Sequence, residues 1–345
     1  MTKPSLRPSC LEDFEQALVR QRDLVRHIYL NVDLTEYECS SSNERLFGPI
    51  DMQYVPNSNW RRIPEVSAVT RFMIRRQFRH YFEPWELEYI LSRFSRLTDF
   101  IYEPWPFEYT SIYLGPWERA LIPTGMPETL KRLTIFQDSK QYLTERALQD
   151  RNYVSISPEY MSEFDFVDIT KSTAQTSLTL DELSVSFYVD AMNFFEACEE
   201  EWTWDHLKSL SLTSSLLFRS IKGQDQRIDS LLLTAAKFLL RMPNLTTMVL
   251  WNGGTGEACG FIYTRTKHYA HITWQGTWDL EMSRQVLEAW EDVAKLHLVE
   301  LRVRHECLKE TIRSHGDAIF HLNLPCQVIE PTSFWQIRME DAQGL

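Results

Sequence analysis

The sequence predicts an α/β fold: an irregular leucine-rich-repeat-like solenoid with a mostly parallel sheet and outer helices, plus a β-hairpin insertion near residues 258–274. Three observations support this prediction. A short leucine pattern recurs along the chain, apolar helical stripes lie between its copies, and two alternating runs flank a polar turn. One repeat unit of this kind cannot bury its apolar face alone, so stacked units share a continuous core.

The recurring pattern is a leucine, two further residues, an apolar residue, one residue and another apolar residue. Five clear copies occur, and they begin at Leu130, Leu180, Leu207, Leu245 and Leu298. Weaker copies occupy residues 66–73 and 97–101. The last four residues of each copy alternate between apolar and polar, which is the period of a β-strand. We therefore expect parallel strands that lie side by side in chain order.

Helical segments are expected between these strands. Pro84 suits a first helical position, and apolar residues follow it at helical spacing. Asp190 can cap a second helix through its carboxylate. Residues 228–239 and 286–296 carry two further apolar stripes. This alternation of strands and helices would also fit a doubly wound sheet, which is the alternative fold.

The intervals between the leucine copies are uneven, and the longest exceed the roughly 20–29 residues of a regular leucine-rich repeat. These intervals must therefore hold insertions. Residues 137–179 are polar and end in a Ser/Thr-rich run, which predicts a surface excursion. Near the start of the chain, Ser9 can cap a helix that leads into an apparent strand over residues 25–34. We expect a single domain over residues 1–345.

Charge and composition limit the expected partners and compartment. The formal net charge is −12, and an acidic surface repels phosphate backbones and anionic lipids, so we expect neither nucleic acid nor a membrane as a partner. The first residues lack the apolar core of a secretory signal. The most apolar stretch, residues 231–242, contains two basic residues and is too short to span a bilayer. The six cysteines are scattered, which is typical of reduced thiols. We expect a cytoplasmic or nuclear protein.

The sequence predicts no catalytic residue, no cofactor and no metal site. The glycine-rich run 253–260 follows a strand, but a phosphate loop needs a helix directly after its glycines, and strand-like residues follow here. We expect a turn instead. His268 and His271 flank the predicted hairpin turn and would point to opposite faces. No serine occupies a Gly-x-Ser-x-Gly motif, and no local pattern indicates an activated nucleophile.

Two sets of side chains are candidates for contact with a partner. The first set is the tryptophans Trp251, Trp274 and Trp278, because exposed aromatic residues dominate interface energetics. Core packing is the alternative for each of them. The second set is the arginines Arg71, Arg75, Arg76 and Arg79. They alternate with aromatic residues and could bind an anion or an acidic peptide. The alternative is an exposed strand edge with carboxylate neighbours.

Several segments resemble a large family of fungal F-box-like proteins of uncharacterised function. They are residues 8–28, 69–77, 102–105, 183–187, 189–191, 204–216, 242–245, 250–254 and 272–278. The resemblance implies a leucine-rich-repeat-like body that holds a target, behind an F-box that docks on the Skp1-type adaptor of a cullin ubiquitin ligase. It brings no catalytic residues. This sequence begins where the segment after the F-box begins, so we expect no direct binding to a Skp1-type adaptor.

The expected function is therefore that of a protein–protein interaction module, similar to the target-binding part of a ubiquitin-ligase substrate adaptor. Its protein target is unknown, and its binding surface would be the strand-end loops or the concave face of the strands. Two alternatives remain. One is an enzyme with a non-obvious site in a repeat-lined pocket, and the other is an F-box-less family remnant without a role in a ligase.

Overall fold

The computed structural model describes residues 49–50, 64–78, 81–82, 84–104, 126–137, 163–217 and 224–343. The chain divides into two compact units, Met1–Ile63 and Pro64–Leu345. The first unit contributes strand β1 (Pro49–Ile50). The helix expected after Ser9 and the strand expected over residues 25–34 lie outside the described residues, and the single domain over 1–345 stays a prediction. All further observations concern the second unit.

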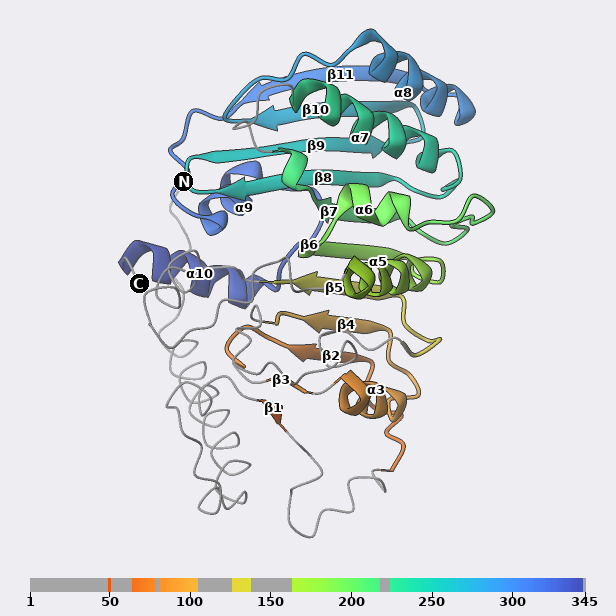
Figure 1. The fold of residues 1–345 in the computed structure, drawn as a ribbon, viewed down its shortest axis with the longest axis vertical. Coiled ribbons are helices and arrows are strands. Elements are labelled where there is room, and N and C mark those ends of the chain that lie inside the picture. Colours follow the sequence, from red (N-terminus) through yellow and green to blue (C-terminus); the bar gives the residue numbers. More distant parts are fainter. Residues whose placement is uncertain are drawn as a thin grey trace, which may run out of the picture. The chain divides into compact units, whose positions relative to one another are not determined.

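One large sheet organises the second unit, and its strands follow the order of the chain (Figure 1). The nine strands are β2 (Arg71–Ile74), β4 (Asp99–Tyr102), β5 (Arg132–Phe136), β6 (Glu182–Asp190), β7 (Ser209–Thr213), β8 (Thr247–Gly254), β9 (Glu257–Arg265), β10 (Tyr269–Gly276) and β11 (Glu300–Cys307). Strands β2 to β8 are parallel, β9 is antiparallel to both of its neighbours, and β10 pairs parallel with β11. A doubly wound sheet would not keep this order.

Helices cover one face of this sheet (Figure 1). They are α3 (Pro84–Ser92), α5 (Glu163–Ser177), α6 (Ala191–Glu196), the short 3-10 helix η6 (Ser215–Leu217), α7 (Gln224–Leu239) and α8 (Arg284–Leu296). Asp190 caps α6 as predicted, because its carboxylate accepts a hydrogen bond from the backbone N–H of Met192. Ser283 caps α8 in the same way. Short strand β3 (Tyr81–Phe82) lies outside the nine-stranded sheet.

The expectation of a polar surface excursion over residues 137–179 needs a correction in its C-terminal part, while residues 138–162 lie outside the described residues. Helix α5 occupies the end of this range, and Ala174 and Ser177 are fully buried. Polar residues can be buried here because their hydroxyls find partners. Ser177 donates to the carbonyl of Ala174 and accepts a hydrogen bond of 2.7 Å from the indole of Trp204. Helix α5 can therefore pack into the core although its sequence is polar, because its Ser and Thr side chains are small and their hydroxyls form hydrogen bonds.

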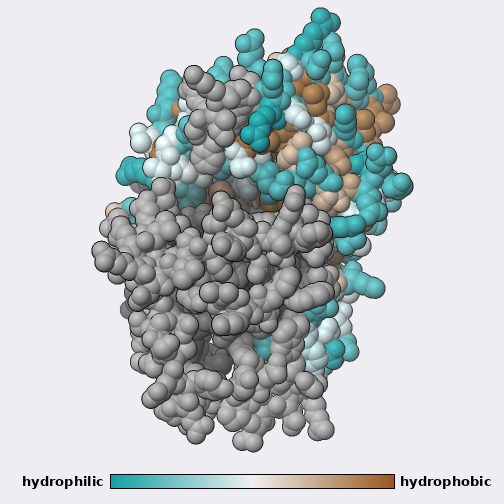
Figure 2. All heavy atoms as spheres, in the orientation of Figure 1, coloured by the Kyte–Doolittle hydropathy of each residue, from teal (hydrophilic) through white to brown (hydrophobic). Residues whose placement is uncertain are grey.

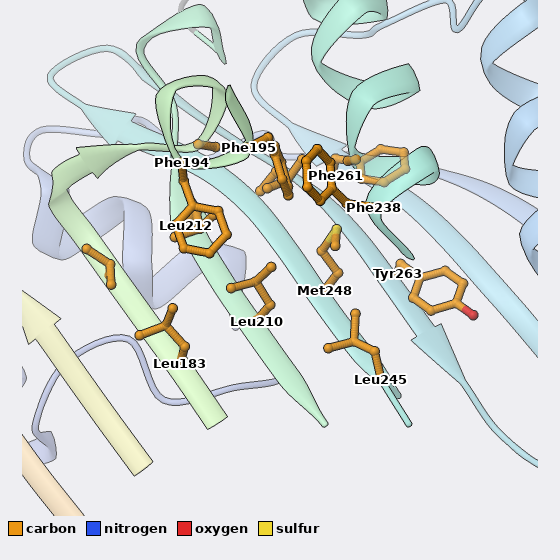
Figure 3. Close-up of a cluster of buried hydrophobic side chains, with 14 of the residues drawn as sticks. Leu183, Phe194, Phe195, Leu210, Leu212, Phe238, Leu245, Met248, Phe261 and Tyr263 are labelled. Carbon is orange, nitrogen blue, oxygen red and sulfur yellow. The ribbon is translucent and has the colours of Figure 1, made fainter. Parts of the chain in front are cut away.

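The strands share one register, so residues at the same level form rows across the sheet. One row runs from Leu133 through Leu183, Leu210, Met248 and Tyr263 to Ile272. These side chains point toward the helices and meet aromatic residues of α6 and α7 in the main core (Figure 3). Alternation along each strand dictates this, because every second residue faces the same side.

The fifth leucine copy behaves differently from the other four. Its neighbour in the sheet is β10 rather than β8, since the β9–β10 hairpin intervenes. Its first leucine, Leu298, is 94% exposed, whereas the first leucines of the other four copies are buried. Leu298 has φ 55°, just after α8. Strand β11 therefore matches the expected direction, but its first leucine lies outside the core.

The glycine-rich run is a hairpin turn, as the sequence predicts. Strands β8 and β9 pair antiparallel around Gly256, which has φ 89°. Such a left-handed conformation favours glycine. The second predicted hairpin is also confirmed, because Ala270 pairs with Arg265 and Trp274 with Phe261. Strand β9, and not a helix, follows Gly256, so this segment does not have the geometry of a phosphate loop.

The C-terminal segment returns across the sheet face opposite the helices, a feature that the sequence analysis did not predict. We call residues 308–343 the C-terminal strap. It contains α9 (His315–Leu322) and α10 (Pro331–Gln343) and lies toward the ends of the parallel strands (Figure 1). It forms a second core with Val249, Trp251 and Ile262 of the sheet. Gly253 allows this approach, since a Cβ there would lie 2.2 Å from the Cβ of Ala318.

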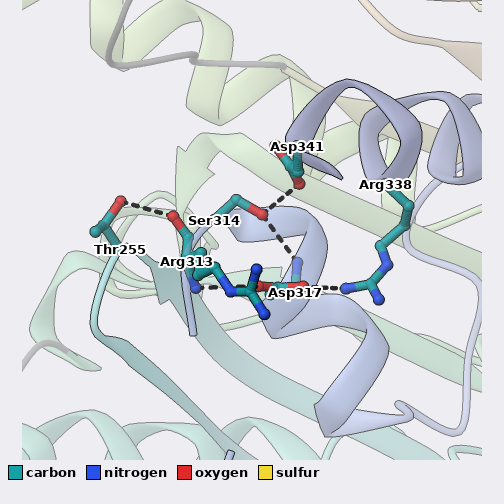
Figure 4. A network of polar contacts seen from close by, with 6 residues as sticks. All are labelled: Thr255, Arg313, Ser314, Asp317, Arg338 and Asp341. Carbon is teal, nitrogen blue, oxygen red and sulfur yellow. Dashed lines mark hydrogen bonds and ion pairs between the residues drawn. The ribbon is translucent and has the colours of Figure 1, made fainter. Parts of the chain in front are cut away.

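Polar contacts hold the two helices of the strap together (Figure 4). Ser314 caps α9 by accepting from the N–H of Asp317, and it donates to the carboxylate of Asp341 in α10. Asp317 in turn forms an ion pair with Arg338 of α10. Thr255, in the β8–β9 turn, donates to the carbonyl of Arg313 at 3.1 Å. The strap is thereby tied both to itself and to the sheet.

A buried charge pair anchors the far end of the strap. The guanidinium of Arg76, just after β2, is fully buried and donates two hydrogen bonds of 3.0 Å to Glu340 of α10. Glu103, just after β4, accepts from the backbone N–H groups of Arg76 and Glu330. Burial raises the pKa of Glu103. The strap therefore connects the last strands of the sheet with the first.

We predict that Leu210→Ala lowers the free energy of unfolding by about 2–5 kcal/mol, because a fully buried leucine leaves a cavity between β7 and the helices. Chemical denaturation measures this change. Ser230→Ala on the exposed side of α7 is the control and should change stability by less than about 0.5 kcal/mol. A loss below about 1 kcal/mol at Leu210 would contradict the assigned core.

We predict that Leu298→Gly stabilises the protein. The N–H groups of Leu298 and Val299 close the end of α8 on the carbonyls of Lys295 and Ala294, an arrangement in which glycine is the usual residue at this left-handed position. An exposed leucine there gains no packing and keeps the backbone strain, so glycine should add about 1 kcal/mol. Thermal and chemical unfolding measure the gain. Leu298→Ala, which retains a Cβ, should give much less of it.

Candidate functional site

The strap leaves part of the opposite sheet face uncovered, and a continuous row of polar side chains crosses it. We call this the polar row. Its members, from one edge of the sheet to the other, are Arg71, Asp99, Arg132, Glu182, Ser209, Thr247, Thr264, His271 and Arg302. Each is paired in register with the next. Asp99 is buried, and the others are exposed or half-buried.

Charges alternate at the β2 end of the polar row. Arg132 donates from Nε and Nη2 to the two carboxylate oxygens of Asp99 at 2.5 and 2.7 Å, and Arg71 lies 3.6 Å from the same carboxylate. Burial by itself would raise the pKa of Asp99. The hydrogen bonds from Arg132 and Thr98, together with the nearby guanidinium charges, outweigh burial and lower the pKa overall. Asp99 is therefore a fixed negative charge that orients Arg132.

A hollow of about 50 Å³ opens beside these charges. Its walls include Arg71, Asp99, Arg132, Glu182 and Ser209 of the polar row, with Cys326 and Gln327 of the strap. Thr134 and Ser184, two residues further along their strands, also line it. The hydroxyl of Ser184 is buried, and no hydrogen-bond partner is found for it in the described part of the chain. Volumes of ligand pockets commonly run from about 300 to 1,000 Å³, so this hollow fits only a small group.

Positive charge gathers at the β11 end of the polar row. Arg302 lies over the ring of Tyr269, with 4.7 Å between its Cζ and the ring centroid. Arg304 has neither a hydrogen bond nor an ion pair with any described residue. Burial lowers the pKa of His271, and the neighbouring Arg304 and Arg302 lower it further. Arg302 also lies 3.4 Å from the carboxylate of Glu300, so Arg304 supplies the guanidinium at this end that can bind an acceptor.

The three tryptophans predicted as partner anchors are buried. Trp251 lies beneath the strap, with its ring 5.2 Å from that of Phe187 in an edge-on contact. Trp274 and Trp278 pack edge-on against each other in the main core, where the indole of Trp274 donates to the carbonyl of Trp278. Rings in these positions cannot meet a partner without unfolding. The core-packing alternative describes all three.

The four predicted arginines do not form one free patch. Arg71 belongs to the polar row, Arg75 lies 3.7 Å from Glu330, and Arg76 is buried against Glu340. Arg79 lies outside the described residues. Arg71, Arg75 and Arg76 each have a carboxylate neighbour, as the alternative expected, but Arg76 is buried and does not lie on an exposed strand edge.

The sequence analysis missed exposed apolar side chains on the strap. Phe320, Trp335 and Met339 are 45%, 60% and 59% exposed, and Arg338 stacks on the ring of Phe320. Trp335 and Met339 are four residues apart, a spacing that puts them on one side of α10. This four-residue spacing in the sequence could have predicted an apolar side of α10.

In Figure 2 the described surface is mostly hydrophilic, with hydrophobic side chains gathered over the region of α7 and α8.

Three of the four described cysteines, Cys198, Cys259 and Cys326, do not resemble activated nucleophiles. Burial raises the pKa of Cys198 to about 12 and that of Cys326 to about 11, and it raises the pKa of Cys259 as well. A protonated thiol is a poor nucleophile. Within the described ranges, no three His, Cys, Asp or Glu side chains converge to hold a metal ion. Every helix described here is too short or too polar to cross a lipid bilayer.

The comparison with protein families assigns most of this chain to a known family. A family of unknown function, DUF6546, matches residues 125–330. The chain belongs to this family. In this DUF6546 member the matched range contains strands β5 to β11 and helix α9, with the polar row from Arg132 to Arg302. Arg71, Asp99 and helix α10 lie outside it. No curated protein and no solved structure matches the chain.

We predict that Asp99→Asn destabilises the protein in a pH-dependent way. The folded-state pKa of Asp99 is depressed, so its contribution to stability is present above the unfolded pKa of about 4 and is lost as the pH falls through the lower folded value. The variant should be about 1 kcal/mol less stable at neutral pH. The difference should shrink below pH of about 4.

Urea unfolding of both proteins between neutral and acidic pH measures this difference. Adding Arg132→Met to the Asn variant is the control, because it should cost little more once the carboxylate is gone. A difference that stays constant at every pH would contradict the assigned ion pair.

Proposed function

We propose that the chain is a protein–protein interaction module whose polar row receives an extended segment of a target protein, as the target-binding part of an F-box protein would. The observation that carries this proposal is the polar row itself. It crosses all nine strands without interruption, and every member except the buried Asp99 is exposed or half-buried. With strands about 4.8 Å apart, the row is about 38 Å long, enough for a peptide of about eleven extended residues.

The order of the strands supports a leucine-rich-repeat-like solenoid as the scaffold. Successive strands are neighbours, helices α3 to α8 cover one face, and the other face carries the polar row. Repeat proteins of this kind use such a face for binding. The irregular intervals, the hairpin of β9 and β10 and the strap would be the particular features of this solenoid.

The chemistry of the row suits a polypeptide better than a small substrate. Hydroxyls in the centre can donate or accept, and charged groups at both ends can meet either sign. The hollow beside the row is too small for a substrate of ordinary size, but a single side chain could enter it. A surface that offers many modest contacts along a line favours an extended segment as ligand.

We predict that Ser209→Arg, in the centre of the polar row, blocks target binding. Arginine would obstruct the path of the segment and would add a charge between Glu182 and Thr247. Ser230→Arg on α7 makes the same chemical change on the opposite side of the sheet and should leave binding intact. Affinity purification with the two variants and the unchanged protein, followed by mass spectrometry, identifies proteins that only Ser209→Arg loses.

A protein identified in this way is then purified, and its affinity for the three chains is measured by calorimetry. We expect the dissociation constant of Ser209→Arg to be at least tenfold larger, which corresponds to a loss of about 1.4 kcal/mol in binding free energy. Equal binding by Ser209→Arg and Ser230→Arg would place the binding surface elsewhere and would overturn this proposal. Circular dichroism on both variants checks that they remain folded.

A further inference from the structure

The hollow beside the polar row is lined by a buried hydroxyl for which the described residues provide no hydrogen-bond partner. Ser184 is only 6% exposed, and its Oγ has no hydrogen-bond partner among the described residues, yet it lines the hollow. Buried polar side chains almost always have a partner from protein, water or ligand. A group that enters the hollow can supply the partner that Ser184 lacks among the described residues.

Among the polar groups that line the hollow, a donor and an acceptor lie on the neighbouring strands β5 and β6. Arg132 uses Nε and Nη2 on Asp99, which leaves Nη1 of the same rigid guanidinium available. Glu182 pairs in register with Arg132, and no described residue binds its carboxylate. Side chains directly opposite each other on neighbouring strands lie about 5 Å apart. A single group of a few atoms can therefore contact both of them.

The charges that line the hollow cancel. Arg71 and Arg132 contribute two positive charges, and Asp99 and Glu182 contribute two negative ones. A carboxylate entering the hollow would meet Glu182, and an ammonium group would meet the two guanidinium groups. A neutral group with both an acceptor and a donor would satisfy Arg132, Glu182 and the hydroxyl of Ser184 together.

The volume of the hollow limits the size of this group. A space of about 50 Å³ compares with the roughly 10–15 Å³ that one water needs, so it holds only a few heavy atoms. A carboxamide has three. We propose that the hollow binds the side-chain carboxamide of an asparagine or glutamine in the target segment, with its oxygen toward Arg132 and its nitrogen toward Glu182. This inference rests on the proposed function, because the polar row would hold the rest of the segment.

Selectivity follows from the same groups. An aliphatic side chain would leave Ser184 and Glu182 without a partner, and sites built to hydrogen-bond one group reject analogues that lack it. An aspartate in place of asparagine would put a second carboxylate beside Glu182. The target segment should therefore carry asparagine or glutamine at one fixed position.

A random dodecapeptide phage library selected on the immobilised full chain tests this inference. We expect the bound peptides to be enriched in asparagine or glutamine at one aligned position. For the best synthetic peptide, replacing this residue by alanine should weaken binding about tenfold, and replacing it by aspartate should weaken it at least as much. Glu182→Gln and Ser184→Ala should each abolish the enrichment, whereas Ser230→Ala should keep it.

Both hollow variants should remain folded, because Glu182 is exposed and the Ser184 hydroxyl has no described partner to lose. Selected peptides that are blocked by Ser209→Arg but show no amide enrichment would overturn the carboxamide site and leave the proposed function standing. Enrichment that persists in Glu182→Gln and Ser184→Ala would also overturn it. If no peptide binds, or if peptides bind Ser209→Arg equally well, the proposed function fails and the carboxamide site fails with it.

Discussion

The common register of the nine strands is the constraint on which the rest of the molecule depends. Because side chains alternate along every strand, one level such as Leu183 and Leu210 must face the helices, and the adjacent level must face the opposite side. The buried row fixes the register, since a shift by one residue would expose every leucine. The polar row is then a direct consequence of the apolar one. Burial of the core thus positions Arg132, Glu182 and Ser209 side by side, although they are distant in the chain.

The strap decides how much of this opposite face stays open. Its anchor is the pair of Arg76 and Glu340, in which a fully buried guanidinium meets a carboxylate that is about one-fifth exposed. Burying a charge is costly, and such a pair is favourable only when its geometry is good and further hydrogen bonds accompany it. The two parallel hydrogen bonds to Glu340 meet this condition. A buried ion pair is weak evidence for stability, because the cost of desolvating both charges offsets much of their attraction. Here it joins α10 to the residue that follows β2.

The sequence predicted those parts of the fold that local patterns encode. The third residue of each of four leucine copies supplies Arg132, Glu182, Ser209 and Thr247, so even the polar row was implicit in the pattern. The fifth leucine copy does not follow this rule. Its first leucine, Leu298, lies in the turn that ends α8, and β11 contributes Arg302 rather than Glu300 to the polar row. The strap could not be predicted. Its anchors join residues 264 and 227 positions apart, and no local period records such contacts. Apolar residues of the strap also cover Trp251 and remove it from the surface.

A strained backbone conformation in β6 accompanies the packing of the second core. Phe187 has φ 59°, an uncommon conformation for a bulky residue, within an irregular stretch of the pairing with β7 between Val185 and Asp190. This conformation places its ring against Phe136 and Trp251 beneath the strap, and its N–H donates to the hydroxyl of Thr213 at 2.7 Å. Strain of this kind persists only where the surroundings over-determine it. One half of the opposite face is therefore closed by apolar packing that tolerates strain. The rest of that face keeps the exposed charges of the polar row. It also keeps the hydroxyl of Ser184, for which the described residues provide no hydrogen-bond partner.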